Sequence, residues 1–155
     1  MNPKTLQARW QVGAILPEDV PNAAVTLLES GADTPALRVL AGLRSPTRWD
    51  LLPWIERYFR EAGLGQLSDG DARWQLAYDT AREIVAGTVT PLDGATALWH
   101  LANDLELPEP LRYFVYLAAD YGEGPEDPAT EAAWFDAKIV ETAKELLVSE
   151  GAPRL

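Results

Sequence analysis

The segment Leu111–Tyr121, which reads LRYFVYLAADY, contains the longest uninterrupted apolar run of the chain, residues 113–119. At about 100° per residue, one broad arc of a helix here is filled by apolar side chains: Leu111, Phe114, Val115, Leu117, Ala118 and Tyr121. Tyr113 and Tyr116 extend this cover most of the way round. Because a helix that is apolar on nearly every side has to be surrounded by other elements, we expect a central helix near residues 109–121.

Amphipathic segments bounded by proline, glycine and capping residues flank this helix on both sides. They predict further helices near residues 3–13, 20–29, 35–42, 46–62, 69–86, 91–105 and 128–150. Ser45-Pro46 or Asp50 would start the fourth helix of the chain, and Asp127-Pro128 would start the last one. No segment alternates with a period of two over the length of a strand. The sequence therefore predicts an all-α fold, a single-domain bundle of seven or eight helices over residues 1–155.

The 155-residue chain has an ordinary globular composition, 47% hydrophobic and 24% charged, and a net charge of −11. Residues 1–78 carry eight basic and nine acidic side chains, whereas residues 79–155 carry five basic and fifteen acidic ones. An acidic surface repels phosphate backbones, so the charge disfavours nucleic acid as a partner and favours a basic protein. Alternatively, the negative charge serves only to keep the protein in solution. Association of several copies into a homo-oligomer is also compatible with the sequence.

Several classes of protein are disfavoured by what the sequence lacks. It has no cysteine, which excludes disulfides and thiolate chemistry. Its apolar runs are far shorter than the roughly 20 residues of a membrane span, and its N-terminus lacks the apolar stretch of a signal peptide. We therefore expect a cytoplasmic protein that does not bind a membrane.

The run from Thr90, TPLDGATALWHLANDLELPEPLRYFVYLAADY, carries a recognisable pattern. It begins TP-x-[DE]-G-A, places a tryptophan on the same helix and continues with an F-x-x-L-A helix. The matching residues are Thr90, Pro91, Asp93, Gly94, Ala95, Trp99, Phe114, Leu117 and Ala118. In this pattern the chain resembles small bacterial all-helical proteins of unassigned function. The resemblance implies a helical fold and a bacterial source, and it implies no activity.

Two groups of polar residues are candidates for a site. His100, the only histidine, shares a helix face with Asp104 one turn away, as an acid, a base or a ligand would. Arg112, Tyr116 and Asp120 form a polar seam on the central helix, where Arg112 could grip a carboxylate or a phosphate. A solvated face for the first group and a structural network for the second are the simpler interpretations.

No motif for catalysis or for metal binding accompanies these candidates. Phosphate-binding loops and nucleophile elbows are missing, and a triad would have to be built around a single histidine. Carboxylate pairs at i, i+4, Asp79/Glu83 and Glu141/Glu145, would hold a cation only if two such helices converged. We therefore identify no catalytic residue and expect no metal or cofactor. Enzymatic activity stays uncertain and is the less favoured interpretation.

On the last helix, Trp134 lies off the apolar stripe beside Lys138, Glu141 and Glu145. An outward tryptophan among charged residues is typical of an interface, although packing against the N-terminal helices is an equal alternative. Asp136 falls inside the stripe, so we expect it to make a polar contact, for example to an arginine.

The preferred hypothesis is an acidic protein-binding module, in its sharpest form an immunity-type inhibitor of a basic toxin or nuclease. Two alternatives stay open. The first is a ligand-binding or enzymatic domain that uses His100, Asp104, Arg112 and Asp120. The second is a DNA-binding regulator that uses the arginines between Arg38 and Arg60, namely Arg38, Arg44, Arg48, Arg57 and Arg60.

Overall fold

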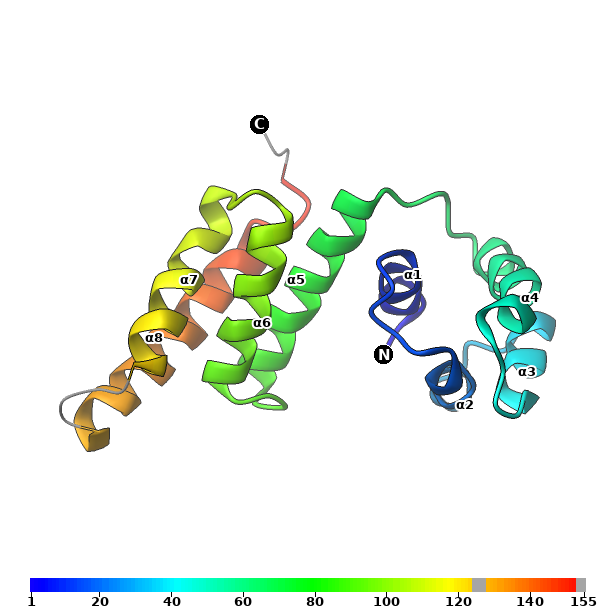
Figure 1. Ribbon diagram of the computed structural model, residues 1–155, viewed down its shortest axis with the longest axis horizontal. Coiled ribbons are helices and arrows are strands. Elements are labelled where there is room, and N and C mark those ends of the chain that lie inside the picture. Colours follow the sequence, from blue (N-terminus) through cyan, green and yellow to red (C-terminus); the bar gives the residue numbers. More distant parts are fainter. Residues whose placement is uncertain (124–127, 153–155) are drawn as a thin grey trace. The chain divides into compact units, whose positions relative to one another are not determined.

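The computed structural model describes residues 1–123 and 128–152 of the chain. These residues form eight α-helices, one 3-10 helix and no β-strand, so the all-α prediction is confirmed (Figure 1). The chain divides into two compact units, Met1–Gln75 and Leu76–Leu155. Whether the two units fold as the one domain expected from the sequence stays a prediction. None of the described helices combines the length and the apolar character that crossing a bilayer requires.

The first unit is built from short helices that begin at proline or at capping residues. Asn2 accepts a hydrogen bond from the Thr5 amide at 2.9 Å and caps the first helix. Thr34 caps the third in the same way, through the amide of Leu37 at 3.3 Å. The elements are α1 (Pro3–Gln11), η1 (Pro17–Asp19), α2 (Val20–Glu29), α3 (Pro35–Gly42) and α4 (Arg48–Glu61).

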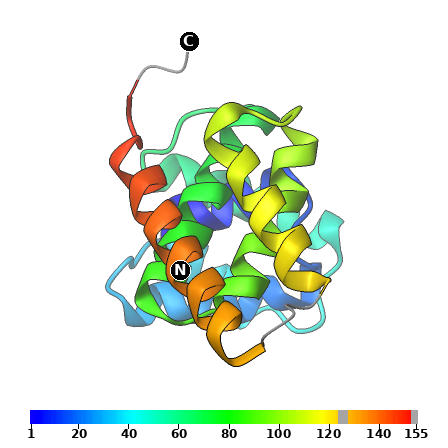
Figure 2. The ribbon, with the colours of Figure 1, turned by 90° about the vertical axis from the view of Figure 1, so that its left-hand side faces the viewer.

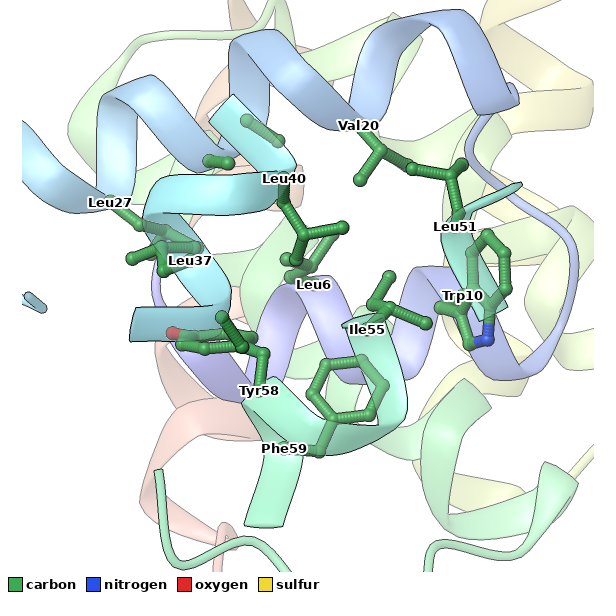
Figure 3. Close-up of a cluster of buried hydrophobic side chains, with 13 residues drawn as sticks. Leu6, Trp10, Val20, Leu27, Leu37, Leu40, Leu51, Ile55, Tyr58 and Phe59 are labelled. Carbon is green, nitrogen blue, oxygen red and sulfur yellow. The ribbon is translucent and has the colours of Figure 1, made fainter. Parts of the chain in front are cut away.

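One hydrophobic cluster joins the four α-helices of the first unit (Figure 3). Its largest fully buried side chains include Tyr58, Leu6 and Leu27. The end of α4 also ties down the start of α3, because the Glu61 carboxylate accepts a hydrogen bond from the Ala36 amide at 3.0 Å. Although burial opposes the shift, hydrogen bonds from Ala36, Thr34 and Arg57 lower the pKa of Glu61. The cluster and this cap fix α3 against α4.

The start of α4 differs from the expectation that Ser45-Pro46 or Asp50 would begin it. Thr47 is the N-cap, and its side chain and that of Asp50 exchange hydrogen bonds with each other's backbone amides as a capping box. Pro53 lies in the second turn rather than the first and has no N–H for the Trp49 carbonyl. Both Trp49 and Pro53 are exposed, so this missing helical hydrogen bond lies on a solvent-facing side of α4.

Helix α5 (Asp69–Ala86) runs without interruption through the boundary between the units. Beyond it the second unit contains α6 (Pro91–Asp104), α7 (Glu109–Gly122) and α8 (Pro128–Val148). Thr90, the first residue of the TP-x-[DE]-G-A pattern, caps α6 by accepting a hydrogen bond from the Asp93 amide at 3.2 Å. Asp127, the predicted cap of α8, lies outside the described residues.

Helix α7 contacts both α6 and α8, and Figure 2 shows α7 and α8 side by side. Its apolar arc is buried as expected, with Phe114 0% and Leu117 3% exposed. The expectation that the helix is enclosed on nearly every side is wrong, because Tyr113 and Tyr116 are 41% and 64% exposed. Helix α7 is therefore amphipathic, and the core cluster of the first unit contains none of its residues.

Gly94 marks a close approach of α6 to α5. A Cβ atom at this position would lie 2.3 Å from Cγ1 and 2.7 Å from Cδ1 of Ile84. Ile84 is only 2% exposed, so it has little room to move away. Glycine is needed here because no side chain fits between the helices.

The buried hydroxyl of Tyr58 generates the first prediction. The Tyr58 side chain is fully buried beside Leu27 and Leu37 (Figure 3), and its hydroxyl has no hydrogen-bond partner in the described part of the chain. Burial also raises the pKa of this phenol. Because an unpaired buried hydroxyl is unfavourable, Tyr58→Phe should raise the free energy of unfolding by about 1 kcal/mol in urea denaturation.

The same change at a paired hydroxyl provides the control for Tyr58→Phe. Tyr121 donates a hydrogen bond to Asp136, so Tyr121→Phe should lower the free energy of unfolding. Because burial raises the pKa of Tyr58 in the folded state, ionisation of this phenol does not affect folding below about pH 10, and at higher pH it lowers the free energy of unfolding since the unfolded chain ionises first. A Tyr58→Phe variant less stable than the wild type at neutral pH would contradict the assignment of an unpaired hydroxyl.

Gly94→Ala is expected to destabilise the protein by about 1–3 kcal/mol, because the added methyl group collides with Ile84. Urea unfolding measures the effect, and Ile84→Ala combined with Gly94→Ala should cost less than the sum of the single changes. The control is Gly122→Ala, where nothing lies within 4 Å of the added atom and the change should not destabilise. If the losses in the free energy of unfolding for Ile84→Ala and Gly94→Ala simply added up in the double variant, the close approach of the two residues would be refuted.

Candidate protein interface

The five residues of the predicted polar site are all exposed in the second unit. His100 and Asp104 lie on the outer face of α6, one turn apart. Arg112, Tyr116 and Asp120 follow one another along α7, also on the solvent side. The seam on α7 is therefore wet, and its charges are hydrated rather than buried among apolar side chains.

Arg112 acts on the backbone of the turn between α6 and α7. Its Nε donates a hydrogen bond to the Leu107 carbonyl at 2.7 Å, and the Leu107 amide donates to the Ala102 carbonyl at 2.7 Å. Glu106 and Leu107 have φ values of 61° and 55°, a left-handed conformation that is unfavourable for side chains of this kind. Arg112 thus stabilises a strained turn, which is the structural interpretation of this residue.

None of the five residues lines either of the two hollows described in the first unit. One hollow of about 420 Å³ lies beside α1 and α2 and includes Arg9, Ile15 and Asn22. The other, of about 580 Å³, lies beside α1 and α4 and includes Trp10 and Arg60. Within residues 1–123 and 128–152, no three acidic or histidine side chains are grouped so that they could hold a metal ion.

Helices α7 and α8 together present three exposed aromatic side chains. Tyr113 and Tyr116 are 41% and 64% exposed on α7, and Trp134 is 55% exposed on α8. The Lys138 ammonium lies 5.8 Å from the centre of the Tyr113 ring, so the stripe of α8 that carries Trp134 adjoins the outer face of α7. Within the second unit Trp134 therefore faces outward, and its packing against the N-terminal helices stays an open alternative.

A second layer of aromatic residues supports Trp134 from below. The Trp134 ring meets Phe135 edge to face at 5.1 Å between ring centres, and Phe135 packs on Tyr121 at 5.2 Å. Tyr121 in turn donates a hydrogen bond to Asp136; burial and this carboxylate raise the pKa of the Tyr121 phenol. The expected polar contact of Asp136 is therefore made, with a tyrosine in place of the arginine suggested as an example.

Exposed carboxylates lie on the same two helices as these aromatic side chains. Glu141 and Glu145 continue the exposed stripe of α8, and Asp120 lies one turn beyond Tyr116 on α7. Glu141 accepts from Lys138 at 3.3 Å and keeps 58% of its side chain exposed. We call this surface the α7–α8 face, defined by Tyr113, Tyr116, Asp120, Trp134, Glu141 and Glu145.

The arginines between Arg38 and Arg60 are partly used by the first unit itself. Arg38 pairs with Asp33 through two hydrogen bonds of 2.7 and 2.6 Å, and the bond to Arg38 lowers the pKa of the Asp33 carboxyl. Arg57 pairs with Glu61 at 3.0 Å. The DNA-binding alternative would therefore depend mainly on Arg44, Arg48 and Arg60.

The sequence predicts Trp134, Glu141 and Glu145 as an interface and places Tyr116 and Asp120 in a separate polar seam, but it does not join the two groups into one surface. Tyr113 is expected only as apolar cover, although it is exposed on the same side of the helix as Asp120. That shared side with a charged residue was the signal that could have identified Tyr113 as exposed.

The chain matches no family model, and no curated protein or solved structure is similar to it. The resemblance to small bacterial helical proteins therefore stays a prediction. Its function has to be argued from its own surface.

The contact of Arg112 with the turn gives a third prediction. Arg112→Ala should lower the free energy of unfolding by about 1 kcal/mol, because the Leu107 carbonyl loses a charged donor. Asp120→Ala, an exposed charge two turns along the same helix, is the matched control and should change stability by less than about 0.5 kcal/mol. Equal stability of the two variants in urea unfolding would show that Arg112 does not hold the turn.

Proposed function

We propose that this protein is a non-enzymatic module that binds a basic protein through its second unit. The observation that carries the proposal is the division of charge between the units. The first unit has eight basic and nine acidic side chains, whereas the second has five basic and fifteen acidic ones, a net charge of −10. The change in charge falls at the boundary between two compact units, so one unit bears nearly the whole negative charge.

The α7–α8 face has the composition of an interface with a charged partner. Tyrosine and tryptophan are the side chains most often found as energetic anchors in interfaces, and three of them are exposed here. Their ring faces can also receive the arginine and lysine side chains of a basic partner by cation–π contact. The surrounding carboxylates, Asp120, Glu141 and Glu145, would orient the partner and accelerate its association.

Trp134 is suited to the role of an anchor because its ring is already held in place. Its edge-to-face contact with Phe135, and the contact of Phe135 with Tyr121, restrict the ring before any partner binds. A side chain that is ordered in advance loses less conformational entropy on binding.

In its sharpest form, the proposal is an immunity-type inhibitor of a basic toxin or nuclease. A nuclease binds the negatively charged phosphates of nucleic acid with a positively charged surface. An array of carboxylates is negatively charged as well, so it can bind the same surface. This form of the proposal rests on charge complementarity and on the lack of any catalytic motif in the sequence.

The test is a calorimetric titration of the protein with positively charged proteins that are encoded beside its gene. We expect one of them to bind, with an affinity that falls at least about tenfold between about 0.05 and 0.5 M salt, because ions screen the carboxylates. Trp134→Ala should weaken binding by about tenfold or more, and Glu141→Gln with Glu145→Gln should mainly slow association.

Trp49→Ala provides a matched control, since Trp49 is an exposed tryptophan of the first unit. At dilute protein concentration, the affinity of this variant for the partner should equal that of the wild type. An affinity that does not respond to salt, or that does not change in Trp134→Ala, would count against the proposal.

A further inference from the structure

Trp49 is the most exposed tryptophan of the first unit, with 80% of its surface accessible. It lies in the first turn of α4, directly after Arg48. Tryptophan is normally well buried, and a ring left this open at a fixed position on a helix is characteristic of a contact surface.

Arg48, the neighbour of Trp49 in the sequence, stacks on an aromatic ring of the core. Its guanidinium lies 4.1 Å above the centre of the Trp10 ring, and Trp10 is part of the core. Stacking uses the flat face of the guanidinium, whereas its N–H groups lie in the plane and remain available for a carboxylate. No described carboxylate forms an ion pair with Arg44 or Arg48, and Asp50 is engaged with Thr47.

We infer that Arg44, Arg48 and Trp49 form a docking site for the acidic second unit of another copy of this chain. We call it the Trp49 site. The argument is charge complementarity: two exposed arginines precede an exposed tryptophan within six residues of sequence, and the second unit carries a net charge of −10. Glu141 and Glu145 on α8 are exposed carboxylates one turn apart, and carboxylates pair strongly with guanidinium groups.

The contact joins two different surfaces, so each bound copy still offers one free Trp49 site and one free acidic face. Contacts of this head-to-tail kind extend into a ring or a chain of copies rather than ending at a symmetric dimer. Because the same α7–α8 face is proposed to bind a basic partner, self-association and partner binding would compete for it.

The experiment is sedimentation velocity of the purified full chain over a range of concentrations, at low and at high salt. We expect species larger than a monomer that grow with concentration at low salt and dissociate at high salt. Arg44→Glu combined with Trp49→Ala should weaken association at least about tenfold. Leaving Arg48 unchanged keeps its contact with Trp10. Arg60→Glu, an exposed arginine at the other end of α4, is the matched control and should associate normally.

A complementation test distinguishes the head-to-tail contact from other ways of associating. Glu141→Lys with Glu145→Lys removes the acidic face, and Arg44→Glu with Trp49→Ala removes the Trp49 site. At concentrations where the wild type begins to associate, each variant alone should be monomeric, whereas their mixture should form only a one-to-one dimer, because one intact site and one intact face remain. A monomeric wild type at every concentration and salt, or a mixture that does not associate, would overturn the inference. Only this chain is present, so failure here does not affect the proposed function.

Discussion

The fold depends on the burial of one apolar face of each helix, because several of the helices are too short to be stable alone. Helices α1, α2 and α3 have nine, ten and eight residues, and isolated helices below about 12–15 residues are marginal in water. In the first unit, four such faces meet in one cluster, so each helix supplies the apolar surface that stabilises the others. Capping residues then decide where each helix starts.

The helices and most of their ends could be predicted because capping and periodicity are local properties. Asn2, Thr34 and Thr90 cap as their sequence positions indicate, since each precedes a proline and then an apolar arc. The start of α4 was harder to predict because two signals compete. Ser45-Pro46 resembles a helix start, whereas the hydrogen bonds between Thr47 and Asp50 determine the actual one.

The candidate site was less predictable because tyrosine suits both core and surface. Its ring is apolar and its hydroxyl is polar, so a helical wheel cannot decide whether Tyr113 and Tyr116 are covered. That depends on where α6 and α8 pack, which is a tertiary property. The two units were hidden for another reason: their boundary lies inside α5, where no glycine- or proline-rich linker marks it.

The course of α5 through this boundary also limits how the chain could be rearranged by recombination. A genetic crossover between Gln75 and Leu76 would cut a helix whose hydrogen bonds span the cut, and each fragment would carry unpaired backbone groups at its new end. Neither unit could therefore be exchanged between genes without interrupting α5. A crossover that leaves the helical hydrogen bonds intact would fall before Asp69 or after Ala86, so that one of the two fragments contains the whole of α5.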